Sequence, residues 1–462
     1  MKILKFSSTL LKNGSALQRV AEIIARSEKT GRSVAVFPGL NGVGDYLIRA
    51  AKLAAADEDY RKQLQSVKDL HMGLVQELIP AREQAGVITP LQIMINDLED
   101  VLKGVQLLRE YTKRTLDLVL SFGVQMSCCL VAGYFQVCGL PAVILDARRI
   151  IRTNDYHGNA QINREVTSEL ISARFEKENN TLPVIGGGLA CAESGATTSL
   201  GKNGADYTAS LLAETLNAGS IEIWTDEDGV MSADPAYVKE AFIIPELNYQ
   251  EAMELAYFGA KILHPRTMIP AVEGDIPIQI CNVNKPGERG TLISSRAAEC
   301  PYDIRGIASF SGAALVNIEG GGMIGIPGIA ARVFSALAGA EINIMMISQA
   351  SSEHSICLVF SQGEADRALG ALTEELDPEL NNGSIRKFEL LKDLVVAAVI
   401  GENMRGTPGI SGKVFSSLGR AGVNVLAIAQ GSSERNISLV IGKRDQAAAL
   451  KTIHNTFLAG EV

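Results

Sequence analysis

Short runs of apolar residues alternate with longer stretches of helical periodicity through the first half of the chain. The short runs predict buried β-strands at residues 2–6, 33–37, 142–145, 183–185 and from 221. The longer stretches predict helices at residues 16–26, from 45 to about 79, from about 90 to 118, 127–138 and 207–216. Strands that alternate with helices in this way predict an α/β fold, with a mostly parallel sheet covered on both faces.

The predicted strand that starts at residue 221 runs directly into an acidic loop that contains glycine. In open α/β sheets, ligands bind beyond the carboxyl ends of the strands. Thr225, Asp226 and Asp228 therefore lie where a binding site is expected.

The last third of the chain contains an internal repeat that holds its register without a gap. Residues 325–329, 331–335 and 347–353 recur as the following segments: 406–410, 412–416 and 428–434. Each copy has a Gly-Pro-Gly turn, an amphipathic helix and a predicted strand, at 342–347 or 423–428. A turn that opens a helix presents free backbone N–H groups, which can bind a carboxylate. A repeat that serves only dimerisation is the alternative.

Length and charge limit the classes of protein to which this chain can belong. A chain of 462 residues is too long for one core and suggests two or three domains. The net charge of −9 argues against general binding to nucleic acids or to anionic membranes. No run of 18 or more apolar residues is present, so no membrane span is expected.

The seven cysteines form no C-x-x-C pair, and most have apolar neighbours in the sequence. Buried, reduced thiols and no metal site are therefore expected. The first six residues are too short and too mixed to form a signal peptide. Together these features predict a soluble, cytoplasmic protein.

Two segments carry a resemblance to a known family. Residues 221–235 read IEIWTDEDGVMSADP, and residues 257–267 read YFGAKILHPRT. These segments resemble the nucleotide-binding part of aspartokinases, especially the long, threonine-regulated type. The C-terminal repeat resembles a tandem pair of ACT domains, which bind amino acids where two such units pack.

The resemblance covers essentially the whole chain and implies its domain organisation. An amino-acid-kinase-like domain is expected at residues 1–295, followed by tandem ACT domains at 296–462. In the family the two ACT units are intertwined and mediate dimerisation, so the resemblance implies a homodimer or a larger homo-oligomer. It also implies ATP with Mg²⁺ as cofactor, if the chain is an active kinase.

The phosphate-facing segment of the family reads Lys-Phe-Gly-Gly-Thr-Ser, whereas residues 5–10 of this chain read KFSSTL. Lys5 therefore keeps the cation that would meet the transferred phosphoryl group. Ser7 and Ser8 replace both glycines. A serine can replace glycine there only if φ is negative and its β-carbon does not collide with the phosphate.

The acceptor side departs further from the family pattern. The second loop reads FPGLNGVGD at residues 37–45, with Pro38 at the serine position and Gly44 at the threonine position. Neither side chain can hydrogen-bond a substrate. In the third segment, Val124 occupies the position of a glutamate that receives the ammonium group of the substrate. Loss of a desolvated ion pair costs about 2–5 kcal/mol, so Val124 argues most strongly against aspartate as acceptor.

The fourth segment reads SGATTSLGKNGAD at residues 194–206. Many relatives have an arginine at the position of Ala196, where it holds the α-carboxylate. Ala205 replaces a serine, whereas Asp206 matches the residue that orients the reacting groups. The resemblance therefore assigns catalytic roles to Lys5 and Asp206.

The nucleotide side is better preserved. Thr225, Asp226 and Lys261 match the nucleotide-binding residues of the family. A tyrosine is commonly found at the position of Met231, and an arginine at the position of Ala236, so one phosphate-facing cation is missing.

The ACT repeat keeps the amide residues that contact the regulatory amino acid in threonine-sensitive relatives. These effector-binding candidates are Asn343, Gln349, Asn424 and Gln430. Amide side chains can accept from an ammonium group and donate to a carboxylate. Threonine or lysine is the effector that the resemblance implies. Turn stabilisation is the alternative role for Asn343 and Asn424.

Three interpretations of function stay open. In the first, the chain senses an amino acid through its ACT domains and has little or no kinase activity. In the second, it is an active aspartate kinase with a rearranged site. In the third, it phosphorylates a different small carboxylate, because Val124 and Ala196 suit an acceptor without the amino-acid head group. The residues of the site, and not the fold, must decide among them.

Overall fold

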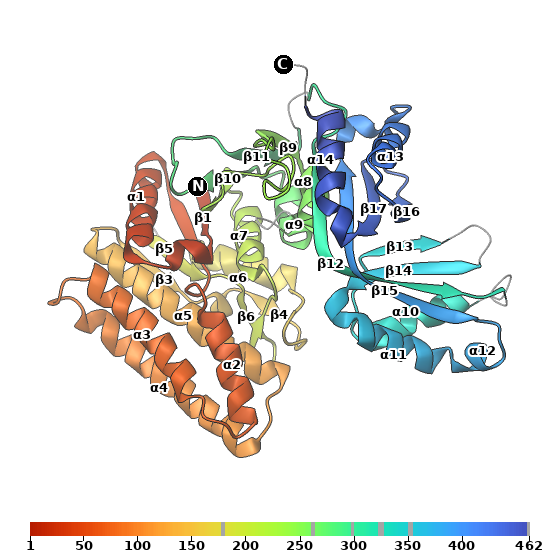
Figure 1. Cartoon of the computed structure of the whole chain (residues 1–462). Helices are drawn as coiled ribbons and strands as arrows, with labels where there is room; N and C mark the ends of the chain where they lie inside the picture. The colour runs from red at the N-terminus through yellow and green to blue at the C-terminus, as the bar shows by residue number, and fades with distance from the viewer. Residues whose placement is uncertain (177–180, 260–263, 297–299, 322–327, 350–353, 460–462) are drawn as a thin grey trace. The chain divides into compact units, whose positions relative to one another are not determined.

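The computed structural model describes residues 1–176, 181–259, 264–296, 300–321, 328–349 and 354–459 (Figure 1). The chain divides into two compact units. Unit 1 comprises Met1–Val230, Pro245–Tyr249 and Ile262–Ala297, and unit 2 comprises Met231–Ile244, Gln250–Lys261 and Ala298–Val462. The domain boundary at residues 295 and 296 stays a prediction, but two earlier segments pack with the C-terminal part of the chain.

The centre of unit 1 is an eight-stranded sheet whose strands pair in parallel, except for the antiparallel pair β10–β11. In spatial order its strands are β3 (Ala142–Leu145), β5 (Leu182–Gly186), β2 (Ser33–Phe37), β1 (Lys2–Phe6), β8 (Ser220–Thr225), β10 (Ile278–Asn282), β11 (Thr291–Ser294) and β9 (Glu246–Asn248). The predicted α/β fold with a mostly parallel sheet is confirmed. The parallel strands β1, β2, β5 and β8 bring their carboxyl ends to one edge of the sheet.

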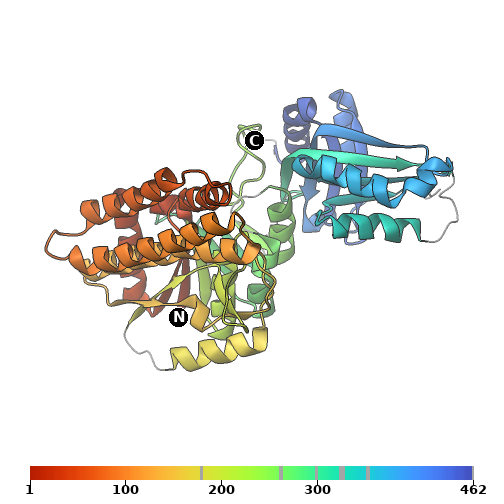
Figure 2. The same cartoon turned by 90° about the horizontal axis from the view of Figure 1, so that it is seen from below.

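A large apolar core joins one face of this sheet to a layer of helices. The helices of that layer are α1 (Gly14–Thr30), α2 (Val43–Ala55), α3 (Arg61–Leu78), α4 (Ala85–Leu108) and α5 (Lys113–Val137). Helices α6 (Arg164–Phe175), α7 (Gly204–Thr215) and α9 (Pro265–Glu273) contact one another, and α7 also packs on β1, β2 and β8. Figure 2 shows the long orange helices on one side of the unit 1 sheet and the yellow helix α6 on the other.

Two predicted helix boundaries are wrong. The helix expected from residue 45 to about 79 is two helices, α2 and α3, because the chain turns at Asp57 with φ of 59°. The helix expected from about 90 to 118 is also interrupted, at Arg109 with φ of 55°. Thr112 then caps α5 by accepting from the Thr115 N–H, and α5 includes the segment 127–138 almost entirely. Left-handed turns at non-glycine residues have little sequence signal.

A small three-stranded sheet flanks the main sheet. Its strands are β4 (Arg152–Thr153), β6 (Leu189–Ala192) and β7 (Thr197–Ser199). The β6–β7 hairpin turns through Gly195, which has φ of 83°. Ala196 lies in this turn, where its carbonyl accepts from the Ala192 N–H.

Unit 2 contains both copies of the repeat in one six-stranded sheet. The first copy comprises β12 (Gly306–Glu319), α10 (Ile329–Gly339), β13 (Met346–Gln349), β14 (Ser355–Ser361), α11 (Ala365–Glu375) and the short α12 (Asp377–Asn381). The second comprises β15 (Lys387–Ile400), α13 (Ile410–Arg420), β16 (Val425–Gln430), β17 (Asn436–Gly442) and α14 (Gln446–Phe457). The strand order is β13-β14-β12-β15-β17-β16. The predicted repeat of βαββ units is confirmed.

The two copies are intertwined through their long strands, as the resemblance implied. Residues 306–311 of β12 pair with the second half of β15, and Ile307 belongs to the core of the second copy. Conversely, Phe388 and Leu390 of β15 pack against the core of the first copy. Each copy therefore lends half a strand to the other.

The edge strands of the repeat lie slightly later than predicted. β13 starts at Met346 instead of residue 342, and β16 starts at Val425 instead of residue 423. Helix α8 (Tyr249–Phe258) ends just before residues 260–263, and Lys261 lies outside the described residues. The Lys261 prediction therefore stays a prediction.

By length and composition, one described helix, α5, is apolar enough to cross a membrane, although no such span was expected from the sequence. Of its most apolar window, 72% is buried inside the structure. Val119, Met126 and Phe135 of α5 belong to the core of unit 1. A buried core helix meets the same criteria, so α5 is weak evidence for a membrane span.

Candidate active site

The side chain of Lys5 points toward helix α7, because alternate residues of strand β1 face opposite sides of the sheet. Leu4 and Phe6 of β1 belong to the core under helices α1 to α5, so Lys5 points to the opposite face. There its Nζ lies 2.6 Å from Oδ1 of Asp206, in the first turn of α7, and both side chains are buried. The contact is an ion pair and not an aligned hydrogen bond, because Oδ1 has no hydrogen-bond partner of good geometry. The structure thus brings together the two residues that were predicted to be catalytic.

Glycines allow helix α7 to approach the carboxyl end of β5. A β-carbon at Gly187 would lie 2.6 Å from both Cα and Cβ of Ala205, and one at Gly204 would lie 2.7 Å from Cα of Gly188. The N–H of Gly188 also donates to Oγ1 of Thr208. Asp206 is therefore positioned by a backbone packing that only glycine permits.

The two serines that replace the family glycines fit the backbone without strain. Ser7 has φ of −72° and ψ of 151°, a region open to every residue, and its N–H donates to the Trp224 carbonyl. Ser8 starts a short 3₁₀ helix that ends at Leu11. The negative φ that a serine needs at this position is therefore present at Ser7.

The loop after β1 is tied to the loop after β8. Thr9 donates from Oγ1 to Oδ1 of Asp226 at 2.7 Å, and Thr225 lies next to the same oxygen at 3.4 Å. Thr225 is buried, whereas Asp226 is exposed. The predicted nucleotide-side residues therefore lie beyond adjacent carboxyl strand ends, beside the segment that carries Ser7 and Ser8.

Asn282, at the end of β10, holds the acidic loop in place. Its Nδ2 donates to Oδ1 of Asp228 at 2.6 Å and to the Asp226 carbonyl at 3.2 Å. Lys285 donates to Oδ2 of Asp228 at 2.9 Å. The hydrogen bonds from Lys285 and Asn282 lower the pKa of Asp228, so this carboxylate stays ionised at neutral pH.

A cavity of about 360 Å³ opens beside this region, between the loop after β2 and helix α5. Three of the altered acceptor-side positions line it: Ser8, Gly44 and Val124. The other lining residues are Gly39, Leu40, Asn41, Gly42, Val43, Asp45, Leu47, Leu120 and Gly123. The structure thus gathers three of the predicted substrate-pocket positions around one cavity.

Val124 gives this cavity an apolar wall. Its Cγ1 lies so close to the carboxyl end of β5 that a β-carbon at Gly186 would be 2.9 Å away. The next residue, Gln125, accepts from Nη2 of Arg148 at 2.8 Å. Among the described residues that line the cavity there is no lysine or arginine, and Asp45, which is exposed, is the charged one.

The other four predicted substrate-pocket positions, Ser7, Pro38, Ala196 and Ala205, do not line this cavity. Pro38 directly follows β2 and precedes the lining loop, and Ala205 is buried against Gly187. Ala196 is buried in the β6–β7 turn of the small sheet. Their roles as substrate contacts stay predictions.

A second cavity of about 360 Å³ lies in the second ACT copy. The turn at residues 406–409, the start of α13 and Gln430 line it, together with Glu434. Gln430 accepts from Oγ of Ser411, while Glu434 accepts from the Gly406 N–H at 2.7 Å. Gln430, one of the four effector candidates, therefore lies at a turn–helix junction of the kind expected to bind a carboxylate.

All four effector candidates are exposed, and the structure does not place the other three in this cavity. Asn343, Gln349 and Asn424 lie in or just before the edge strands β13 and β16. The turn of the first copy is largely outside the described residues, because it includes residues 322–327. The effector roles of these residues stay predictions.

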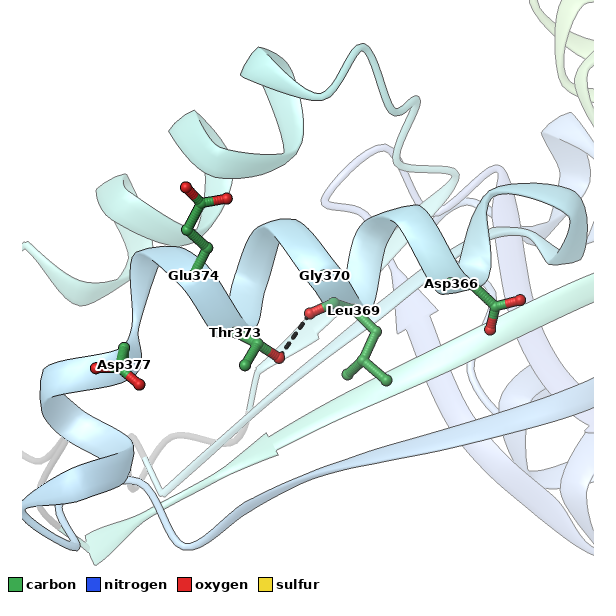
Figure 3. Close-up of a pocket in the computed structure, with 6 residues that line it drawn as sticks. All are labelled: Asp366, Leu369, Gly370, Thr373, Glu374 and Asp377. Carbon is green, nitrogen blue, oxygen red and sulfur yellow. Dashed lines mark hydrogen bonds between the residues drawn. The ribbon is translucent and has the colours of Figure 1, made fainter.

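Figure 3 shows a wider groove along α11 that carries Asp366, Thr373, Glu374 and Asp377. Its side chains come from one helix and the start of α12. Thr373 Oγ1 donates to the Leu369 carbonyl of the same helix. The groove therefore lacks the convergent polar groups of a binding site.

Comparison with known proteins places this geometry in a family. The sequence model of the Amino acid kinase family matches residues 1–282, and that of the ACT domain matches residues 316–376 and 398–457. Aspartokinase 1, chloroplastic, of Arabidopsis thaliana is 30% identical over 471 residues, which cover 98% of this chain and 80% of that protein. The chain belongs to the aspartokinase family. Kinases of this family use ATP.

Longer aspartokinases are similarly related. Bifunctional aspartokinase/homoserine dehydrogenase 1, chloroplastic, of Arabidopsis thaliana is 32% identical over 460 residues, covering 98% of this chain and 50% of that protein. This aspartokinase-family chain thus spans about half the length of the bifunctional relatives that it matches.

Solved aspartokinase structures share the fold. Aspartokinase III of E. coli, in complex with aspartate and ADP in the R-state, superposes with a TM-score of 0.85 at 27% identity, covering 99% of both chains. The same enzyme in complex with lysine and aspartate in the T-state gives a TM-score of 0.80, also at 27% identity and 99% coverage of both chains. The expected amino-acid-kinase fold with tandem ACT domains is confirmed.

Sequence reasoning missed three residues that shape the site: Thr9, Asn282 and Lys285. Thr9 lies in the segment KFSSTL, so its link to Asp226 had a local signal. Asn282 ends a buried strand, and the rule that places ligands beyond carboxyl strand ends could have indicated it. The pairing of Lys285 with Asp228 had no such signal, because the two residues are distant in the sequence.

Proposed function

We propose that this aspartokinase homologue senses an amino acid through its ACT domains and phosphorylates aspartate weakly or not at all. In the family reaction a carboxylate oxygen attacks the γ-phosphorus of ATP, and ADP leaves as an acyl phosphate forms. Such a reaction depends on positioning and charge neutralisation, so a poorly held acceptor lowers its rate.

One observation carries the proposal: Val124 lines the acceptor cavity where a relative's glutamate would receive the ammonium group. Aspartate would bring that charge against an apolar wall, and the lost desolvated ion pair is worth about 2–5 kcal/mol. Asp45 also lines the cavity but is exposed. Exposed ion pairs contribute only about 0–1 kcal/mol, so Asp45 does not replace the glutamate.

The residues on the nucleotide side of the site favour continued binding of Mg·ATP. Lys5 supplies a buried cation next to the carboxyl ends of β1 and β8, and the loop after β8 carries Asp226. The described residues include no group of three or more His, Cys, Asp or Glu side chains suited to a dedicated metal site. In kinases Mg²⁺ is held by one or two carboxylates and the phosphates themselves, so this chain needs no such group. Bound Mg²⁺ would neutralise phosphate charge.

A second candidate function is phosphorylation of a different small carboxylate. The observation that favours it is the cavity itself, which stays open at about 360 Å³ although its polar anchors have changed. An acceptor without an α-amino group leaves no unpaired ammonium group at Val124. An assay that traps the acyl phosphate with hydroxylamine, run with a panel of small carboxylic acids in place of aspartate, separates this function from the first.

On the regulatory side, we propose threonine or lysine as effector, homo-oligomeric assembly and a cytoplasmic location. E. coli aspartokinase III has been solved with lysine and aspartate, and it resembles this chain over its whole length. The cavity at Gln430 supports amino-acid binding, because helix N-termini favour carboxylates and amides accept from ammonium groups.

The test compares the wild type with Val124→Glu, and with Val124→Gln as a control of similar size without charge. Acyl phosphate formed from Mg·ATP and aspartate is trapped with hydroxylamine. Val124→Glu is expected to raise kcat/KM for aspartate by about 30-fold or more, and Val124→Gln by much less. A wild-type kcat/KM for aspartate equal to that of E. coli aspartokinase III in this assay would contradict the proposal.

A further inference from the structure

Helix α5 carries a buried carboxylate, Asp117, about two helical turns before Val124. Its side chain is 3% exposed. Oδ2 of Asp117 accepts a hydrogen bond from Nδ1 of His157 at 3.0 Å and another from the Gly158 N–H at 2.9 Å. Because an ionised carboxylate can only accept, Nδ1 of His157 carries the proton. Asp117 therefore connects α5 to the loop that contains His157 and Gly158.

This loop, at residues 154–161, follows β4 and is closed at its base. The Asn154 N–H donates to the Gln161 carbonyl, and the Gln161 N–H donates to Oδ1 of Asn154, both at 3.0 Å. Joined ends limit the conformations that a loop can adopt. A contact at His157 therefore also restrains the other residues of the 154–161 loop.

The far side of the 154–161 loop packs against the segment that leads into helix α7. The Ala160 N–H donates to the Ser199 carbonyl at 2.9 Å. A β-carbon at Gly201 would lie 3.0 Å from Oδ1 of Asn159 and 3.1 Å from the Gly158 carbonyl oxygen. The loop and this segment therefore lie in direct contact, and glycine at position 201 permits it.

The segment between β7 and α7 determines where Asp206 lies. Gly201 and Asn203 both have left-handed backbones, with φ of 78° and 60°. This conformation costs a non-glycine residue about 1–2 kcal/mol, so the surrounding contacts must hold it in place. The Asp206 N–H donates to the Asn203 carbonyl at 3.0 Å, and the Leu200 N–H donates to the Gly188 carbonyl at 3.0 Å. A shift of this segment would therefore also move Asp206.

Two further hydrogen bonds connect the 154–161 loop to its surroundings. Oδ1 of Asn159 accepts from Nη1 of Arg266 at 2.8 Å, in the first turn of α9, which packs on α7. Oδ1 of Asp155 accepts from Oγ of Ser194 at 2.5 Å, in the β6–β7 turn. Both bonds are exposed, whereas the Asp117 carboxylate is buried. A hydrogen bond to a buried charge is costly to lose, so Asp117 contributes most to holding the loop.

We propose that Asp117 and His157 are positioning residues, which hold the 154–161 loop against residues 199–203 and thereby keep Asp206 opposite Lys5. Both act through the loop, and all of these residues belong to unit 1. The consequence for phosphoryl transfer rests on the proposed function and on the orienting role that the resemblance implies for Asp206. The positioning itself does not.

The first test needs no ligand and compares hydrogen exchange in the wild type, His157→Asn, His157→Gln and His157→Ala. The amide nitrogen of asparagine lies near the position of Nδ1 in histidine, and that of glutamine near Nε2, so only asparagine can still donate to Asp117. His157→Gln and His157→Ala are expected to raise exchange rates about tenfold in residues 154–161 and 199–206. His157→Asn is expected to keep them near the wild-type values.

The matched control is Asp100→Asn, which breaks an exposed pair with Lys103 in α4, at 3.2 Å. It is expected to leave both segments unchanged. A rise at 154–161 without a rise at 199–206 in His157→Gln overturns the proposal. Equal rates in the His157→Asn and His157→Gln proteins also overturn it, because the hydrogen bond to Asp117 would then have no effect.

The second test measures aspartate phosphorylation by Val124→Glu, with His157→Gln or His157→Asn added. The double variant with His157→Gln is expected to lose about tenfold in kcat, since misplaced reacting groups slow the transfer, and the one with His157→Asn is expected to recover it. Equal kcat values in the two double variants contradict the positioning role. If Val124→Glu itself stays inactive, the proposed function fails, and the exchange comparison still decides the positioning.

Discussion

Val124 and Ser7 both replace residues of family motifs, but they affect the site differently. Ser7 takes the place of glycine with φ of −72°, so its backbone is unstrained. Val124 gives a cavity an apolar wall, and under the proposed function an ammonium group bound there would have no carboxylate partner. A motif comparison shows both substitutions, and the structure adds that the backbone tolerates Ser7 and that Val124 lines a cavity.

The double substitution Ser7→Gly/Ser8→Gly tests this distinction. Because neither serine lies in the left-handed region, glycine adds only chain entropy, about 0.5–1 kcal/mol of destabilisation at each position. We expect no gain in aspartate phosphorylation and a small loss in the free energy of unfolding, measured with denaturant. A large gain in activity would show that the serines themselves block the phosphates.

At the scale of elements, much of the architecture was predictable from the sequence. Strands β1, β2 and β3 were predicted correctly because their apolar runs are short and continuous. The breaks at Asp57 and Arg109 were not predicted, because nothing in a helical pattern marks a residue that will adopt a left-handed conformation. Catalytic roles for Lys5 and Asp206 were expected from motifs, whereas their ion pair and the packing that positions it depend on contacts between distant segments.

The junction of β5 and α7 yields a prediction on stability. In Gly187→Ala the new methyl group would collide with the Ala205 backbone, so α7 must shift and take Asp206 with it. We expect a loss of about 1–3 kcal/mol in the free energy of unfolding. The control Gly104→Ala, in α4 with nothing within 4 Å of the new atom, is expected to stabilise by about 0.5–1 kcal/mol. Equal changes in the thermal unfolding temperature of Gly187→Ala and Gly104→Ala would contradict this packing argument.

His71 in helix α3 makes the free energy of unfolding depend on pH. Burial lowers the pKa of His71 to about 4, although its hydrogen bond to the Val67 carbonyl opposes the shift. Between that value and about 6.5, the unfolded chain binds more protons than the folded chain, so stability falls as the pH falls through this window. His71 alone accounts for up to about 3 kcal/mol of this loss.

The variant His71→Leu removes this proton linkage. Urea unfolding between pH 4.5 and 7.5 is therefore expected to show a weaker pH dependence than in the wild type. Part of the slope persists, because burial also lowers the pKa of His454. An unchanged slope would mean that His71 is not the group responsible.

At the scale of the whole molecule, the chain combines an amino-acid-kinase unit that has a cavity lined by Val124 with an ACT unit that has a cavity at Gln430. The sequence predicted both domains from a repeat and two motifs. It did not predict that residues 231–244 and 250–258 would pack with the ACT unit, because this packing depends on contacts between segments distant in the sequence. Only tertiary contacts, such as Glu251 with Arg305, show that division.

The most direct test of the account is a calorimetric titration of aspartate into the protein saturated with Mg·ADP. The account predicts no detectable aspartate binding in the kinase unit at millimolar concentration, because Val124 leaves the ammonium group without a partner. To exclude binding at the ACT domains, the titration is repeated with Gln430→Ala. Clear, saturable binding that persists in this variant would contradict the account.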